Sequence, residues 1–221
     1  MCISKMIKSA CLIVIIIFLV CCVNNKNSFS RQSDSGVTEK IEVGHMKCLQ
    51  VVAETTIEML IASRSVIAKN QELINRDPAT GNYSMKGFVP AVVGSSIAND
   101  FSLMTGHKLK QTSLKVRNPS NSPDKWERKV LKLLGSSEHP EGVSFGEMME
   151  VDGKKNFRFM KPIYVEPGCL QCHGKKREIR PEIRRFLESK YPFDQAFGYK
   201  EGELRGGISV IISLEKLGLD K

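Results

Sequence analysis

Apolar residues recur along residues 37–75 at intervals of three, four and seven positions, which is the period of an amphipathic α-helix. The pattern ends before Pro78, because the residue that precedes a proline resists helical backbone angles. The sequence therefore predicts one long N-terminal helix with an apolar face. That face would hold Leu49, Ala53, Ile57, Leu60, Ile67 and Ile74.

Two shorter helices are predicted in the middle of the chain. The first covers residues 90–104 and stops before Gly106, a residue type that commonly follows a helix end. The second begins with Ser122 as its N-cap and Pro123 as its first residue, because both types are favoured at those positions. Between the two helices, residues 108–116 have a weak strand pattern.

In the second half of the chain the apolar period changes to two, which is the period of a β-strand with one buried face. Residues 145–151 and 156–165 flank Asp152-Gly153, a pair that is typical of a tight hairpin turn. Residues 181–190 have a short, basic helical pattern, and a last hairpin is predicted with its turn at Glu201-Gly202. Alternation in that hairpin continues through Ile208, Val210 and Ile212.

These elements divide the chain into three predicted parts. Residues 1–23 combine two early lysines with an apolar run that is short for a membrane span, as in a secretory signal. A cleaved signal, a lipoprotein anchor with the lipid on Cys22, and an uncleaved membrane anchor remain open. Residues 24–36 are polar and predict a flexible tether. Residues 37–217 are expected to form one α+β domain, in which an antiparallel sheet has flanking helices and the long N-terminal helix.

The sequence Cys169-Leu170-Gln171-Cys172-His173 is the strongest chemical signal in the chain. Two cysteines at this spacing can each add to one vinyl group of haem, and the histidine that follows can bind the iron. A zinc site would need a second pair of ligands, and no other CxxC or HxxxH follows. A thioredoxin-like dithiol or a structural disulfide would also use two cysteines at this spacing. We expect one covalently bound haem c, attached at Cys169 and Cys172, with His173 as the proximal iron ligand.

Haem attachment bears on the compartment and on the remaining cysteine. Bacteria complete the attachment of c-type haem outside the cytoplasm, so a periplasmic or other extracytoplasmic location is expected. Four of the seven cysteines lie in the N-terminal targeting segment. If Cys169 and Cys172 hold haem, Cys48 has no disulfide partner within the chain. Such a residue is a free reactive thiol, an intermolecular bridge or a metal ligand.

The net charge of the chain is +9, and much of the excess lies in residues 175–190. Glutamates alternate with the basic residues there, so the segment is either a solvated helix face or a docking surface for an acidic partner protein or membrane headgroups. Nucleic acid is not expected as a partner, because the segment lacks interleaved aromatic residues and lies outside the cytoplasm. The basic residues are Lys175, Lys176, Arg177, Arg180, Arg184, Arg185 and Lys190.

Four stretches of the chain carry a family resemblance. They are Val93-Gly94-Ser95-Ser96-Ile97-Ala98, Arg117-Asn118-Pro119 continuing to Trp126-Glu127, the haem motif with Gly174, and Ala196-Phe197-Gly198-Tyr199 running into Gly206-Gly207-Ile208-Ser209-Val210. In this order they resemble the PAS-like c-type haem domains with cysteine–histidine axial ligation, a family first catalogued as a domain of unknown function. The resemblance covers about residues 40–215. It implies a PAS-like fold and a distal iron ligand from a cysteine of the N-terminal helix, for which Cys48 is the candidate.

Several residues around the expected haem have more than one interpretation. From the residues alone, His45, His107, His139, a methionine or an empty sixth position compete with Cys48 for the distal position. Arg117 and Asn118 are expected to contact the haem propionates. Their alternative role is to shape the loop before a helix, because Asn and Pro are typical turn residues.

The expected function is that of a sensor of redox state or of a diatomic gas, NO or CO, which works by exchange of the distal Cys48. A thiolate stabilises ferric iron, so reduction would weaken its bond and open the distal side. An extracytoplasmic electron-transfer cytochrome c is the alternative. An enzyme is not expected, because no distal His and Arg pair is visible for acid–base chemistry. The long N-terminal helix also suggests a homodimer.

Overall fold

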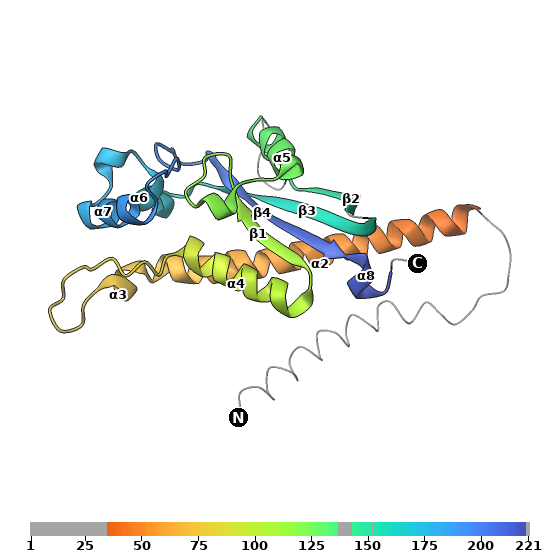
Figure 1. Ribbon diagram of the computed structural model, residues 1–221, viewed down its shortest axis with the longest axis horizontal. Coiled ribbons are helices and arrows are strands. Elements are labelled where there is room, and N and C mark those ends of the chain that lie inside the picture. The colour runs from red at the N-terminus through yellow and green to blue at the C-terminus, as the bar shows by residue number, and fades with distance from the viewer. Residues whose placement is uncertain (1–34, 137–142, 152, 220–221) are drawn as a thin grey trace, which may run out of the picture. The chain divides into compact units, whose positions relative to one another are not determined.

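The computed structural model describes residues 35–136, 143–151 and 153–219, and the segment from Gly44 onward forms one compact unit (Figure 1). The long predicted helix is present, but as two pieces. Helix α2 spans Ser35–Lys69 and helix α3 spans Gln71–Asn75, with a break at Asn70. The apolar period alone did not reveal this break, because the apolar positions continue on both sides of it.

Four antiparallel strands form a single sheet in the order β1-β4-β3-β2. Their bounds are β1 Lys108–Thr112, β2 Phe145–Val151, β3 Lys154–Tyr164 and β4 Leu204–Ser213. The β2–β3 hairpin is confirmed, with Gly153 at a positive φ of 73°. The predicted last hairpin is wrong, because β4 has no strand directly before it and instead lies between β1 and β3. The α+β class with an antiparallel sheet and a long N-terminal helix is confirmed.

One face of the sheet packs against α2 and α4 (Pro90–Thr105), as Figure 1 shows. The apolar face of α2 contributes Ile57 and Leu60, which are almost fully buried. Alternate residues of the two central strands meet them, because side chains of a strand point to opposite faces in turn. The strand residues in this cluster are Phe157, Phe159, Ile163, Ile208, Val210 and Ile212. This cluster is the main apolar core of the domain.

The opposite face of the sheet carries helix α5, Lys125–Gly135. The apolar side of α5 packs on Met160 of β3, which is fully buried. The guanidinium of Arg158 lies over the ring of Trp126, 4.4 Å from its centroid. The second face is therefore covered by a single amphipathic helix and a cation–π contact.

The start of α5 differs from the prediction by two residues. Asp124, not Ser122, is the N-cap. Its carboxylate accepts the backbone N–H of Glu127 at 2.8 Å, and the Glu127 carboxylate accepts the backbone N–H of Asp124 at 2.9 Å. This reciprocal capping box satisfies two backbone donors, which a serine two residues earlier could not reach.

Short helices gather between the end of β3 and the start of β4. They are η2 (Pro167–Cys169), α6 (Leu170–His173), η3 (Lys176–Glu178) and α7 (Pro181–Lys190). Elsewhere, η1 (Pro119–Asn121) precedes α5 and α8 (Leu214–Leu217) follows β4. Because β3 and β4 are antiparallel, the end of one lies beside the start of the other, and the CxxCH motif lies at that end of the sheet. Within the described ranges, no helix has the length and apolar character that a membrane crossing needs.

Candidate haem site

The two motif cysteines lie on consecutive short helical turns. Cys169 ends η2, and Cys172 lies three residues later in α6, so both are on one side of the same turn. Both are free thiols and both are partly exposed. Burial raises the pKa of the Cys172 thiol above its ordinary value. At neutral pH this cysteine is therefore a protonated thiol that reaches the surface.

The turn closes on Gly174 directly after His173. Its backbone N–H donates to the carbonyl oxygen of Leu170 at 2.9 Å. A Cβ at this position would lie 2.7 Å from that same oxygen, so only glycine fits without a shift of the backbone. The sequence after the motif thus allows His173 to turn back over the cysteines.

The imidazole of His173 has one nitrogen fixed and one available. Its Nδ1 lies 2.8 Å from the carbonyl oxygen of Ala196, which can only accept, so Nδ1 carries the proton. Nε2 is then the basic nitrogen. Burial, followed by the positive charges of Arg205 and Arg117, holds the pKa of His173 well below 6.5. The ring is neutral at pH 7 and presents a lone pair, as a metal ligand requires.

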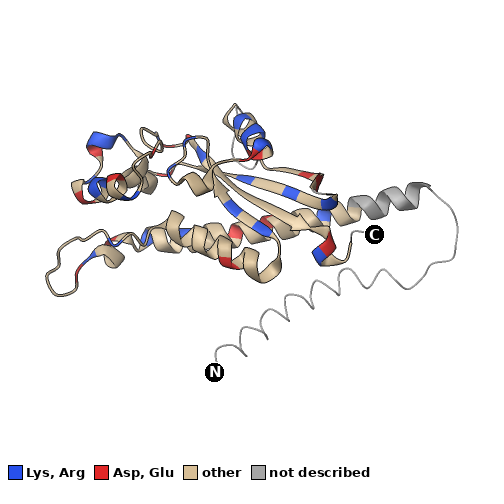
Figure 2. Ribbon diagram, viewed as in Figure 1, with Lys and Arg blue, Asp and Glu red and all other residues tan. Residues whose placement is uncertain are grey.

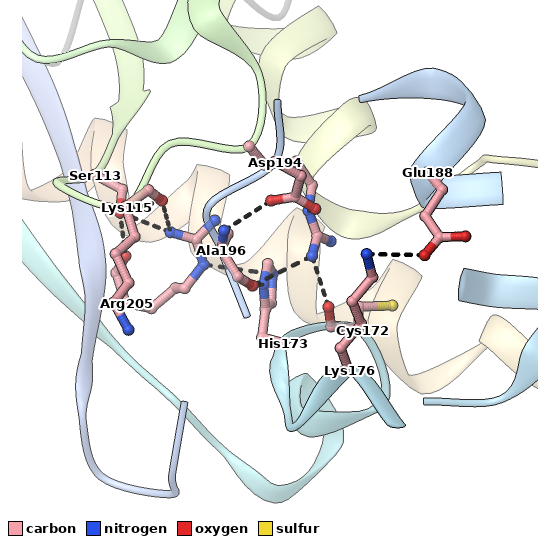
Figure 3. A network of polar contacts seen from close by, with 10 residues as sticks. Ser113, Lys115, Cys172, His173, Lys176, Glu188, Asp194, Ala196 and Arg205 are labelled. Carbon is pink, nitrogen blue, oxygen red and sulfur yellow. Dashed lines mark hydrogen bonds and ion pairs between the residues drawn. The ribbon is translucent and has the colours of Figure 1, made fainter. Parts of the chain in front are cut away.

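A loop before β4 holds the motif in place. The backbone N–H of Tyr199 donates to the carbonyl of His173 at 3.0 Å, and the N–H of Gly198 donates to the carbonyl of Gly174 at 2.9 Å. The ring of Tyr199 meets the imidazole edge-on, with centroids 6.1 Å apart. Figure 3 shows Asp194 and Ala196 of this loop converging on Cys172 and His173 of the motif. The stretch Ala196-Phe197-Gly198-Tyr199, which carries part of the family resemblance, therefore supports the motif.

Arg117 braces the motif from the loop that follows β1. Its Nε donates to the carboxylate of Asp194 at 2.6 Å. Its Nη2 donates to the carbonyl of Cys172 at 2.6 Å and to the carbonyl of Ala196 at 3.3 Å. These contacts use Nε and Nη2 of the guanidinium. Arg117 therefore positions the motif in this structure, and its contact with a propionate stays a prediction.

Asn118 also has a structural role in place of the predicted contact with a propionate. Its side-chain oxygen accepts the backbone N–H of Ser120 at 3.1 Å and caps the short helix η1. The alternative, that Arg-Asn-Pro shapes the loop before a helix, describes this residue correctly.

Cys48 is not brought to His173 in this structure, which corrects its prediction as the distal ligand. It precedes Arg64 by sixteen residues on the same helix, and Arg64 is the residue of α2 that interacts electrostatically with Cys169. Sixteen residues correspond to about 24 Å along the axis and to a rotation of about 160° around it. Cys48 is exposed, whereas Ile57 and Leu60 of the opposite side are buried. The thiol therefore lies far from the motif and faces away from the sheet.

The remaining histidines that were candidates for the distal ligand fall into three positions. His45 is exposed, three residues before Cys48 on α2. His107 lies at the far end of β4, where its Nδ1 accepts the backbone N–H of Ser213 at 3.2 Å. His139 lies outside the described residues. Among the methionines, Met85 packs against the same apolar cluster as Cys172, formed by Ile179, Ile183 and Leu187.

Two arginines of the site were missed at the sequence level. Arg205 is the second residue of β4, and its Nε lies 3.4 Å from Nε2 of His173. Arg64 lies in the apolar repeat of α2 and interacts with Arg205. A signal was available for Arg64, because a charged residue stood four positions after Leu60 on a face that is otherwise apolar. For Arg205, which directly precedes Gly206-Gly207, the alternation pattern alone gave no such signal.

Most basic side chains of the segment are paired with glutamates, and basic and acidic residues are mixed along η3 and α7 in Figure 2. Five of its seven basic side chains form ion pairs, at distances between 2.9 and 3.9 Å. The pairs are Lys175 and Arg177 with Glu178, Lys176 with Glu188, Arg180 with Glu72, and Arg185 with Glu182. This pattern favours the solvated face over a docking surface, and the acidic partner stays a prediction.

The arrangement fits a covalently attached haem. Two unpaired thiols lie one turn apart, and a neutral imidazole directly follows them with Nδ1 fixed by a backbone carbonyl. The zinc alternative finds no support, since no cluster of three or more His, Cys, Asp or Glu side chains suited to a metal occurs in the part of the chain that is described. The fold and site thus define an α+β domain that carries a CxxCH motif at one end of its sheet.

The chain belongs to the Tll0287-like family, whose model matches residues 46–213. Among solved structures it is similar to the cyanobacterial heme-protein Tll0287, with a TM-score of 0.58 and 26% sequence identity. That match covers 76% of this chain and 94% of the other. No curated protein matches the chain.

Proposed function

We propose that this protein is a monohaem c-type cytochrome with the haem attached through Cys169 and Cys172 and with His173 as the proximal iron ligand. One observation carries the proposal: Nδ1 of His173 donates to the Ala196 carbonyl, so that Nε2 is left as the basic nitrogen beside two free thiols. The similarity to a protein described as a heme-protein supports it. A bound haem would supply one-electron redox chemistry and a binding position for a diatomic gas.

Different residues of this chain would hold different parts of the haem. The cysteines fix one edge through thioether bonds. The Ala196 carbonyl orients the imidazole and raises its basicity, as second-shell partners of metal-bound histidines generally do. Arg117 ties the Cys172 carbonyl to the same loop, so the thioether and the imidazole are supported by one network.

We propose that the role is sensing of redox state or of NO or CO, and that the chain is not an enzyme. The side chains that meet Nε2 of His173 are cationic: Arg205 contacts it and Arg64 is close enough to lower its pKa. A guanidinium offers no lone pair to iron. A weakly held sixth position would let NO or CO bind the iron. Because Arg64 belongs to α2, a change at the haem can be passed to the long helix.

An electron carrier is the second candidate, because a basic segment directly follows the motif. Such a carrier would dock on an acidic partner through that segment, and the rate would fall with added salt. The ion pairs within the segment weaken this alternative. An electron-transfer rate that is insensitive to salt would argue against it.

Export follows from the same proposal, since attachment of c-type haem is completed outside the cytoplasm. The segment that carries this prediction, residues 1–23, lies outside the described residues, as do residues 24–34 of the predicted tether 24–36. The last two residues of that predicted tether, Ser35 and Gly36, belong instead to helix α2. We propose a periplasmic or other extracytoplasmic location with an N-terminal anchor or lipid. Cell fractionation and the mass of the mature N-terminus test this. The homodimer stays a prediction; Val51, Met59 and Val66 are exposed on α2.

Haem attachment is tested by expressing the full chain in a host that matures c-type cytochromes and measuring the mass of the denatured protein. The native chain should carry one haem that acid and acetone do not extract. The double variant Cys169→Ala, Cys172→Ala should carry none, while Cys48→Ser keeps the full added mass. A native chain without added mass would overturn the proposal. CO added to the reduced native protein then tests the gas site, through a shift of the main absorption band.

A further inference from the structure

Two cationic side chains lie together on the iron-facing side of His173. Nε of Arg205 is 3.4 Å from Nε2 of the imidazole. Arg64 reaches the same place from α2, where its charge interacts with Arg205 and with Cys169. Burial and then the charge of Arg205 lower the pKa of Arg64 to about 10, so both guanidinium groups remain charged at neutral pH.

Neither arginine has a carboxylate partner in the part of the chain that is described. Arg205 donates to neutral oxygens, the hydroxyl of Ser113 at 2.7 Å and the carbonyl of Lys115 at 3.4 Å. Asp194 is the nearby acid, but it is bound to Arg117. Both side chains are partly buried, and because a partly buried charge is stabilised by a counter-ion, two interacting positive charges here suit an anionic group.

Arg64 packs closely against Gly94 of α4. A Cβ there would lie 3.1 Å from Cγ of Arg64 and 3.0 Å from the side-chain amide of Gln111. That amide is itself incomplete: its nitrogen donates to the Ala91 carbonyl and to Ser95, but its oxygen is buried without a hydrogen-bond partner. The close approach of Arg64 and Gln111 to α4 therefore depends on glycine at position 94.

We propose that Arg64 and Arg205 bind the two propionate groups of the haem. The inference rests on the proposed haem attachment and deepens it. A haem carries two carboxylates, and the planar guanidinium fork matches a carboxylate with two parallel hydrogen bonds. Arg205 must leave Nε2 of His173 when that nitrogen binds iron, and its freed donors then meet a carboxylate. The pair also couples the haem to two separate elements, α2 and β4.

The test uses the full, haem-loaded chain and the variants Arg64→Gln and Arg205→Gln, with Arg185→Gln as a matched change of one positive charge on exposed α7. Resonance Raman spectra report the propionate bending mode, which responds to the hydrogen bonds of the carboxylate. We expect this mode to shift in both site variants and to stay unchanged in Arg185→Gln. The affinity of the ferric protein for cyanide should change less than twofold in all three.

Arg64→Lys and Arg205→Lys serve where a glutamine variant does not mature, since they keep the charge but lose the fork. They should shift the same mode by a smaller amount. An unchanged propionate mode in haem-loaded variants overturns the inference while haem attachment stands. So does a tenfold loss of cyanide affinity with an unchanged mode, which would place the arginines over the distal iron position. A native chain without added haem mass overturns the proposed function itself.

Discussion

The carbonyl oxygen of Ala196 lies 2.8 Å from Nδ1 of His173 and thereby determines which ring nitrogen is left for a metal. A backbone carbonyl cannot be protonated or rotated away independently of its loop, so the orientation of the imidazole depends on how that loop is held. Arg117 holds it, through the Ala196 carbonyl and through Asp194, whose other oxygen accepts the N–H of Ala196 at 2.7 Å. The orientation of the His173 imidazole is therefore set by residues far away in the sequence.

Replacing Arg117 by Met should weaken both the fold and the attachment of haem. The change leaves the buried carboxylate of Asp194 and the carbonyl of Cys172 without their shared donor. Loss of charged hydrogen bonds of this kind costs about 2–3 kcal/mol. Denaturant unfolding should show this loss in the free energy of unfolding, and a smaller fraction of the chain should carry haem by mass.

Arg128→Met is the control, because Arg128 is exposed on α5. Its free energy of unfolding should stay within about 0.5 kcal/mol of the native value. Equal effects of the two substitutions would contradict the brace, since they would then reflect only the loss of one positive charge.

Cys48→Ser should leave the electronic state of the iron unchanged. The thiol is exposed on the side of α2 that faces away from the buried residues, about 24 Å along the helix from Arg64. Electron paramagnetic resonance of the ferric protein should therefore be the same with and without Cys48. A low-spin thiolate signal that disappears in the variant would show that the helix brings Cys48 to the iron after all.

Local patterns were sufficient for much of the fold. Period-two alternation and the glycine at position 153 located the β2–β3 hairpin, and the capping and glycine signals located α4 to within one residue. The pairing of β4 with both β1 and β3 was not predictable in this way. It depends on contacts between segments about 40 to 100 residues apart, which no local period encodes.

The site shows the same division. The CxxCH motif indicated the chemistry because its five residues are contiguous in the sequence. Helical geometry fixes the angle between Cys48 and Arg64 around the helix axis. The apolar repeat then determines which of the two faces the sheet. Applied consistently, that repeat places Arg64 on the same side as Ile57 and Leu60, and Cys48 on the other. The family resemblance outweighed this local evidence in the prediction for Cys48.

The pH dependence of stability should include a contribution from Asp124 on the acid side. Burial alone would raise the pKa of this carboxyl, but the backbone N–H of Glu127 and the guanidinium of Arg158 outweigh it and hold the pKa below 3.8. A depressed folded-state pKa stabilises the fold above the unfolded-state value of about 3.9 and is lost as pH falls through the folded-state value. Between about pH 5 and pH 3, the native protein should therefore lose more stability than Asp124→Asn, which keeps a cap but has no charge.

Asp100→Asn, at an exposed position of α4, is the matched control for that measurement. Its stability should follow the native pH curve. The free energy of unfolding is measured with urea at each pH. If it changed with pH in the same way for Asp124→Asn and the native protein, the ion pair with Arg158 would add no stability in solution.

Gly206→Ala should be among the more damaging single-methyl additions to this fold. A Cβ at position 206 would lie 2.2 Å from the carbonyl oxygen of Thr112, so β1 or β4 must move. Overpacking of this kind costs about 1–3 kcal/mol. The same movement would displace Ser113, whose hydroxyl donates to the Arg205 carbonyl and accepts from its guanidinium. We therefore expect a lower free energy of unfolding together with a changed environment of Arg205.

Gly44→Ala is the comparison, because nothing lies within 4 Å of its added methyl and alanine is favoured in a helix. That variant should be as stable as the native protein or up to about 1 kcal/mol more stable. If urea unfolding gave equal losses for both glycines, the close approach of β1 to β4 at Gly206 would be wrong.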